Sequence, residues 1–200
     1  MSGDPNLILD VIPSGSGLCL DLGGNKGGLR RAMEERGYQY INLDVRDFGN
    51  GEPSIISDAH SLPFQNEALD LVVSKDTLEH FIDPWGVVKE VHRALKDGGH
   101  FIIWVPFMHA FHGDDFYRYS PLGLKHLLQG FELVVFDSPL WVFTVVGGAA
   151  IEALKRIHLG FAEQPIKHLC GWLDHRFTRH QSRPASFAAG YRIVACKPAK

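Results

Sequence analysis

The residues best suited to chemistry in this sequence form an acidic, glycine-rich stretch near the N-terminus. An apolar run over residues 18–22 carries one acid, Asp21, and the chain continues as Gly-Gly-Asn-Lys-Gly-Gly over residues 23–28. Glycines allow unusual backbone angles and let a ligand lie close to the main chain. A carboxylate beside such a turn suits a ligand that carries an ammonium and a sulfonium, and it repels a pyrophosphate.

Two glycine patterns compete for this stretch. A dinucleotide fingerprint needs glycine at its first, third and sixth positions, but the third position counted from Gly23 is Asn25. The acid-x-Gly-x-Gly-x-Gly pattern of S-adenosylmethionine (SAM) sites misses the same glycine. Asparagine is a residue that tolerates a positive φ, so this second pattern is favoured. A tight turn with no ligand is the alternative.

The elements around this stretch predict a nucleotide-binding corner. Residues 18–22 favour a buried strand and residues 29–36 an amphipathic helix that Gly37 ends. A second strand over residues 38–43 ends at Asp44, about 20 residues beyond Gly23, where an acid meets the ribose hydroxyls of a bound nucleoside. An ordinary turn aspartate is the other interpretation of Asp44.

The rest of the chain alternates strands and helices, which predicts a parallel sheet with right-handed crossovers. A helix is expected from Asp83-Pro84 to Gly98 with Trp85 on its inner face, and another from Ser120-Pro121 to Gly130. Further strands are expected over residues 54–57, 68–74, 100–105, 131–136 and 188–197.

Three linked segments, 58–64, 69–80 and 88–99, occur in the order and register of a known family. Over about residues 17–106 the chain resembles class I SAM-dependent methyltransferases, and more narrowly their type 11 domain. The resemblance implies a Rossmann-like, doubly wound α/β fold. Its sheet would have seven mostly parallel strands with an antiparallel last strand, helices on both faces and a helical insertion between strands six and seven.

We therefore expect a single domain over residues 1–200. It divides into a lead-in (1–16), a cofactor-binding half (17–106) and a substrate-side half (107–200) with an insertion at 137–186. The resemblance implies SAM as cofactor, S-adenosylhomocysteine as product, and cofactor contacts at Asp21, Gly23, Gly24, Asn25, Gly27, Asp44, Val45, Asp58, Ala59, His60, Lys75 and His80. Asn25 departs from the family pattern, as do the cations Lys26, Arg30 and Arg31 near the helix start.

The segment after the fifth strand carries candidate catalytic and substrate-binding residues. A methyl acceptor that is a hydroxyl or amine needs a base, and His109 and His112 are the first candidates, followed by His80. Candidates for substrate binding are Asp114, Asp115, Tyr117 and Arg118.

Each of these residues also has a structural interpretation. Arg118 either holds an anionic substrate group or pairs with Asp114 or Asp115 and fixes the loop. Each histidine alone is as well explained by a structural role. The spacing His109-x-x-His112-x-Asp114 permits a metal site, but no further ligand is indicated, so no metal is expected.

The insertion at 137–186 combines an apolar, small-residue stretch over 141–150 with helical spacing over 151–161 and a basic, aromatic surround. It is interpreted as a hairpin over the sheet edge, a lid, a contact in a homodimer or, over 141–183, a peripheral membrane patch.

Composition limits the remaining possibilities. The net charge of −3 gives no general attraction to nucleic acid, and no apolar run is long enough to span a membrane. Three scattered cysteines and an N-terminus unlike a signal peptide favour a cytoplasmic protein. We expect a methyltransferase that acts on O or N of a small molecule, for example a saccharide or natural-product intermediate. The alternatives are a catalytically inactive binding protein with this fold and an NAD-dependent oxidoreductase.

Overall fold

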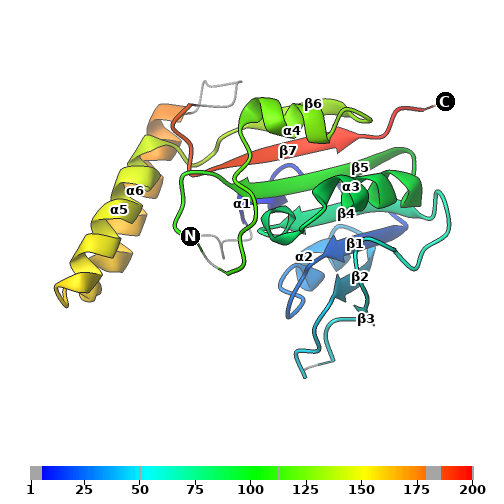
Figure 1. Cartoon of the computed structure of the whole chain (residues 1–200), viewed down its shortest axis with the longest axis horizontal. Coiled ribbons are helices and arrows are strands. Elements are labelled where there is room, and N and C mark those ends of the chain that lie inside the picture. The colour runs from blue at the N-terminus through cyan, green and yellow to red at the C-terminus, as the bar shows by residue number, and fades with distance from the viewer. Residues whose placement is uncertain (1–5, 50, 112, 179–185, 200) are drawn as a thin grey trace.

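The computed structural model describes residues 6–49, 51–111, 113–178 and 186–199. These residues form a seven-stranded sheet in the order β3-β2-β1-β4-β5-β7-β6, with helices on both faces (Figure 1). The strands are β1 (Leu18–Leu22), β2 (Gln39–Asp44), β3 (Ile55–Ile56), β4 (Leu69–Lys75), β5 (Leu95–Pro106), β6 (Glu132–Asp137) and β7 (Gly190–Cys196). The helices are α1 (Asn6–Leu9), α2 (Arg30–Glu34), α3 (Pro84–Ala94), α4 (Pro121–Leu127), α5 (Val142–Arg156) and α6 (Glu163–Thr178), with 3-10 turns η1 (Leu78–His80) and η2 (Gly160–Ala162).

Strand directions confirm the expected fold class. Parallel pairing joins β1 to β2 and β4, and continues from β2 to β3 and from β4 to β5. The last strand, β7, lies between β5 and β6 and is antiparallel to both. The chain runs outward from β1 to β3 on one side and from β4 onward on the other. The order of the strands therefore reverses between β1 and β4, and a ligand crevice is expected at the carboxyl ends of these two strands.

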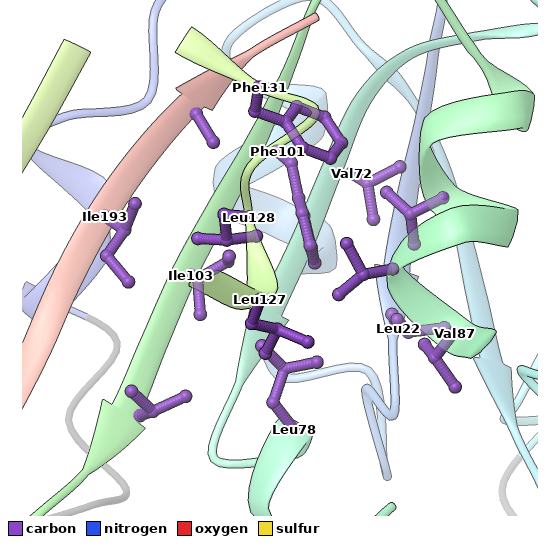
Figure 2. Packing of buried hydrophobic residues seen from close by; sticks show 14 of the residues in the cluster. Leu22, Val72, Leu78, Val87, Phe101, Ile103, Leu127, Leu128, Phe131 and Ile193 are labelled. Carbon is purple, nitrogen blue, oxygen red and sulfur yellow. The ribbon is translucent and has the colours of Figure 1, made fainter. Parts of the chain in front are cut away.

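The core has two layers because both faces of the central strands are covered. On β5, Phe101 and Ile103 pack toward α3 and α4, whereas Ile102 and Trp104 pack toward α1 and α2. Figure 2 shows the first layer, in which Leu127, Leu128 and Phe131 from α4 and the residues after it lie against β5. This alternation follows from the two-residue period of a strand. It fixes which side chains at the strand ends reach the crevice.

Helix α3 ends earlier than expected. The prediction that it continues to Gly98 is wrong, because Leu95 adopts extended angles and pairs with Leu69 of β4, so β5 begins at once. The predicted inward position of Trp85 is also wrong, since that side chain is 46% exposed and its ring packs edge-on against Tyr117. Hydrogen bonds of the sheet thus extend the strand into a stretch whose apolar spacing suggested helix.

The insertion forms a helical hairpin, α5 and α6, whose main contacts are between its own two helices. It lies beyond the ends of the strands, on the side where β5 ends (Figure 1). The expected helix over 151–161 is wrong at both ends: α5 begins at Val142 and ends at Arg156, which leaves Ile157 and Phe161 exposed. Within the described ranges, no helix has the length and apolar character needed to cross a bilayer.

Candidate functional site

A cleft of about 1130 Å³ lies at the carboxyl ends of β1, β2 and β4. Its wall is built by the glycine turn after β1, the end of β2, residues 57–60, the turn after β4 and residues 113–116. This is the crevice that the strand order creates. Its volume is somewhat above the usual range for a small-molecule site.

The glycine turn has the backbone geometry that its composition predicted. Gly23 and Gly27 have φ values of 72° and 73°, and Asn25 has φ 52°, so asparagine takes the left-handed conformation expected of it. A side chain at Gly24 would collide with Asn42 and Asp21, whereas a Cβ at Gly28 would meet no atom within 4 Å. The turn is therefore tight on its inner side and open on the other.

Two features near the start of α2 reduce the number of free donors at the predicted nucleotide-binding corner. Helix α2 has five residues, and N–H groups of the turn are used in short-range bonds such as Gly27 N to Gly24 O (2.9 Å) and Arg30 N to Gly27 O (3.1 Å). The Arg30 side chain donates to Glu52 and lies over the ring of Tyr40. Arg30 is therefore held by protein groups, and Arg31 pairs with Glu35 on the surface.

Asp21 lies beneath the turn. It is 3% exposed, and Tyr40 Oη donates a hydrogen bond to Asp21 Oδ2 at 2.5 Å. Burial, the largest effect, raises the pKa of Asp21 to about 7, although the bond from Tyr40 and the charge of Lys75 act in the opposite direction. Asp21 therefore ionises in the neutral pH range. The charge at this part of the cleft lining then depends on pH.

Asp44 connects the end of β2 to the glycine turn. Its Oδ2 accepts from Asn25 N at 3.2 Å and its Oδ1 from Val45 N at 2.8 Å. Asn42 supports the same turn from below, donating from Nδ2 to Asn25 O at 2.8 Å. The sequence analysis did not name Asn42 or Glu52. Their role in supporting the glycine turn depends on the pairing of β2 with β1, which brings Asn42 beneath the turn.

Asp58, Ala59 and His60 line another side of the cleft. Asp58 Oδ1 accepts from His60 N at 2.9 Å and lies 2.6 Å from His60 Nδ1. These hydrogen bonds lower the pKa of Asp58. The pair is preformed, so it presents a carboxylate and a ring at fixed positions.

The turn after β4 adds an acid that the sequence analysis did not name. Asp76 has φ 52° and its Oδ2 accepts from Lys75 Nζ at 2.7 Å. Its other oxygen, Oδ1, is buried and has no hydrogen-bond partner in the described part of the chain. A buried acceptor left in this state is costly unless a ligand or water satisfies it. The sequence offered one signal for Asp76: it directly follows Lys75, which was already a candidate cofactor contact.

His80 and the 113–118 segment form the remaining wall. His80 Nδ1 lies 3.2 Å from Asp115 Oδ1 and 3.3 Å from the carbonyl oxygen of Asp114. Asp115 is buried and its Oδ2 accepts from Arg118 Nη2 at 2.5 Å. Of the two alternatives for Arg118, the structure therefore contains the ion pair. Asp114 lines the cleft, while Tyr117 donates to the carbonyl of Ile82 and lies outside the lining.

Of the other two histidine candidates, His109 does not line this cleft. His109 lines a second, separate cavity, and its Nδ1 lies 3.0 Å from the carbonyl of Ala110. His112 is outside the described residues. The sequence analysis ranked His109 and His112 ahead of His80, because spacing cannot show which cavity a side chain lines.

One group in the described chain has ligand-type atoms close enough to hold a metal ion: Glu79, His80 and Asp115, whose atoms lie within 4.8 Å of one another. Asp115 already pairs with Arg118, so an ion-pair network accounts for the arrangement. Within the cleft lining, five aspartates face three lysine or arginine side chains: Asp21, Asp44, Asp58, Asp76 and Asp114 against Lys26, Arg46 and Lys75. This balance favours a ligand with positive charge.

Comparisons with known proteins find sequence similarity to methyltransferases. The family model described as a methyltransferase domain matches residues 20–103. An uncharacterized methyltransferase of Mycobacterium leprae is 28% identical over 141 residues, which are 65% of this chain and 50% of that protein. One of Mycolicibacterium paratuberculosis is 24% identical and covers 70% of this chain and 65% of its own length. The chain thus spans about half to two thirds of the length of these relatives.

Solved structures share the fold at low identity. Phosphoethanolamine N-methyltransferase 2 of Haemonchus contortus, solved with phosphomonomethylethanolamine and S-adenosylhomocysteine, has a TM-score of 0.62 and 18% identity, covering 98% of this chain and 52% of that one. The [4+2]-cyclase SpnF has a TM-score of 0.66 and 19% identity, with 98% and 80% covered. Neighbours with one fold can therefore catalyse different reactions.

Proposed function

From the match of residues 20–103 to the methyltransferase domain model, we propose that the protein binds SAM in the cleft and transfers its methyl group to O or N of a small molecule. The observation that carries the proposal is the composition of the cleft. It combines a glycine turn at the strand-order reversal with an excess of carboxylates. A sulfonium and an ammonium fit such a site better than a pyrophosphate does, which disfavours a dinucleotide.

The donor set fits the parts of this cofactor. Asp44 at the end of β2 suits the ribose hydroxyls. The buried Asp76 Oδ1 and the carboxyl of Asp21 suit the cationic groups, and Asp58 with Ala59 and His60 suits the adenine. Gly23, Gly24, Asn25 and Gly27 let the ligand approach the main chain, and Val45, Lys75 and His80 complete the proposed contacts.

When bound, SAM supplies an electrophilic methyl group on a positively charged sulfur. This chain's residues have to align the acceptor, exclude water and remove a proton. His80 becomes the first candidate for the base, because it lines the cleft and Asp115 lies against its Nδ1. A carboxylate in that position fixes the ring and stabilises the imidazolium that forms when Nε2 takes a proton.

The remaining candidates take other roles in the proposal. Asp114 contributes to acceptor binding, Asp115 and Arg118 position His80, and Tyr117 supports the wall through its bond to Ile82. His109 and His112 rank behind His80, since His109 lines the second cavity and His112 lies outside the described residues.

Titration calorimetry with SAM and S-adenosylhomocysteine tests the cofactor, and transfer of tritium from methyl-labelled SAM to candidate acceptors tests the reaction. Asp44→Asn is expected to weaken S-adenosylhomocysteine binding about tenfold, the scale of one hydrogen bond at a charged group. His80→Gln should weaken S-adenosylhomocysteine binding by less than about tenfold, the loss of a single contact, and should abolish methyl transfer. If neither compound binds the wild-type chain, the binding-protein alternative remains.

A further inference from the structure

A second cavity of about 620 Å³ lies between residues 107–111, which follow β5, and the faces of α5 and α6. Figure 1 shows the two helices beyond the strand ends, on the side where the chain leaves β5. We call this cavity the hairpin pocket. It shares no lining residue with the cofactor cleft, but residues close in sequence line both, with Phe111 and Arg118 in the hairpin pocket and Gly113 and Asp114 in the cleft.

Most of the hairpin pocket is apolar. Phe107, Met108, Val145 and Ile151 contribute to its walls, and Gly148 leaves room because a Cβ there would meet no atom within 4 Å. A concave apolar surface with a few polar groups is the usual form of a site for an organic molecule. The apolar part of a ligand therefore has a place in this pocket.

Two polar atoms of the lining are buried without a hydrogen-bond partner among the described residues. They are Thr144 Oγ1, from a residue that is 4% exposed, and Arg118 Nη1. The other end of the Arg118 guanidinium is used, since its Nη2 donates to Asp115 and to the carbonyl of Ala110. Buried donors left in this way carry a desolvation cost that a ligand oxygen would remove.

The lysines of the pocket do not compete for this role. Lys155 and Lys167 both pair with Glu163, with Lys155 Nζ lying 3.4 Å from Glu163 Oε2. Their remaining N–H donors are open to water, since the two side chains are 45% and 26% exposed, whereas Arg118 is the cation among the described lining residues whose unsatisfied donor is buried. Because guanidinium donors match carboxylates closely, we infer that the hairpin pocket binds the apolar, carboxylate-bearing end of the methyl acceptor.

This inference rests on the proposed function and names its substrate class as an apolar carboxylic acid. A chain of charged contacts joins the two cavities. Arg118 of the hairpin pocket pairs with Asp115, and Asp115 Oδ1 lies 3.2 Å from Nδ1 of His80, which lines the cofactor cleft. The carboxylate of the acceptor accepts from Arg118, and Thr144 donates to an oxygen of the ligand. An occupied hairpin pocket then holds the acceptor against the wall that carries His80.

The test uses calorimetry with decanoate as a probe below its micellar concentration, with decan-1-ol as the uncharged comparison. Wild-type protein is expected to bind decanoate at least tenfold more tightly than decan-1-ol. Thr144→Val, which removes the hydroxyl at constant shape, should weaken decanoate binding about fivefold. Equal binding of acid and alcohol would overturn the assignment of the carboxylate.

A matched pair of glycine substitutions tests the location. Gly148→Phe fills the pocket and should abolish decanoate binding, whereas Gly171→Phe adds the same side chain in open space on α6, outside the lining, and should leave it unchanged. Equal binding in both variants would place the probe on the exposed hairpin surface and overturn the inference.

S-adenosylhomocysteine titrations in the same samples separate this inference from the proposed function. Gly148→Phe should bind S-adenosylhomocysteine as the wild type does. Decanoate binding without S-adenosylhomocysteine binding would refute the methyltransferase proposal while the acid site stands. S-adenosylhomocysteine binding without decanoate binding would refute the hairpin pocket alone.

Discussion

The glycine turn after β1 and the α5–α6 hairpin both depend on glycine, for different physical reasons. Gly23 has φ 72° and a Cβ there would lie 2.3 Å from Thr77 Cγ2, so both the backbone angle and the space exclude a side chain. Gly147 lies in an ordinary helix, and a Cβ there would lie 2.4 Å from Cys170 Sγ on the facing helix. One glycine shapes the main chain, and the other allows two helices to approach.

The two regions also differ in what holds them. The glycine turn is anchored by Asp44 and Asn42 of β2, and Glu52 from the loop before β3 accepts from Asn42. The hairpin is held mainly by its own helices, and buried Asp174 of α6 accepts from the backbone N–H groups of Trp141, Phe143 and Thr144 at the start of α5. The turn is thus part of the sheet, whereas the hairpin is a unit that can be altered separately.

The largest effect is expected at the glycine turn. Gly23→Ala should lower the free energy of unfolding by about 3 kcal/mol, because a left-handed angle and an overpacked contact add. Urea unfolding measures this change. Thr77→Ala in the same chain should restore only part of the loss, since the backbone angle stays unfavourable. Gly28→Ala, with open space at its Cβ, is the control and should change little. Complete rescue by Thr77→Ala would contradict this account.

A smaller loss that can be fully rescued is expected in the hairpin. Gly147→Ala should destabilise the protein by about 2 kcal/mol, because its methyl group collides with the Cys170 side chain. Gly147→Ala with Cys170→Ala exchanges the volumes and should recover the loss, since no unusual backbone angle is involved. Thermal unfolding of the two single variants and the double variant gives the coupling. Additive effects would show that the helices do not meet at this pair.

The affinity for SAM should depend on pH at the glycine turn, because Asp21 lies there, and ligand binding at the hairpin should not. Because burial raises the pKa of Asp21 to about 7, SAM binding should strengthen about tenfold from pH 6 to 8 as the carboxyl ionises. Stability should change in the opposite direction. The folded chain holds this proton more tightly than the unfolded chain, so the contribution of Asp21 to stability is fully present below the unfolded pKa of 3.8 and is lost as the pH rises through about 7.

Calorimetry across this pH range measures the dependence, and Asp21→Asn should make the affinity independent of pH. Decanoate binding in the hairpin pocket does not involve Asp21 and serves as the internal control. A SAM affinity that stays constant in the wild type between pH 6 and 8 would show that Asp21 does not face the bound cation.

The smallest effect distinguishes two neighbouring arginines. Arg30→Gln should cost about 1 kcal/mol, because Arg30 is bonded to the largely buried Glu52, which also accepts from Asn42. Arg31→Gln should give no detectable shift in Tm, since its partner Glu35 is on the surface. Differential scanning calorimetry of the two variants compares them. Equal shifts would mean that the Glu52 network does not stabilise the turn.

The sequence predicted the cofactor half of the molecule well, because the signals there are local. Glycine and asparagine at a strand end indicate positive φ angles, and apolar runs such as 18–22 indicate buried strands, so β1 was predicted at its observed bounds. It also placed an acid at the end of β1 and of β2. The seven-stranded order with an antiparallel β7 came from the resemblance, which the pairing confirms.

Other features needed the folded chain because they join residues far apart in sequence. Burial by the sheet, together with Tyr40 from the neighbouring strand, sets the state of Asp21. Among the histidines, only the fold shows that His80 meets Asp115 at the cleft while His109 lies in the hairpin pocket. The end of α3 at Ala94 was likewise decided by pairing with β4.

Residue types and their spacing thus determined that this chain builds a strand, a glycine turn and an acid-lined crevice, because backbone angles and side-chain periodicity act over a few residues. Tertiary structure alone decided which acids are buried, which histidine faces the cleft and that a second cavity exists between the hairpin and residues 107–111. Burial, charge pairing and cavity shape arise from segments that meet only when the chain folds.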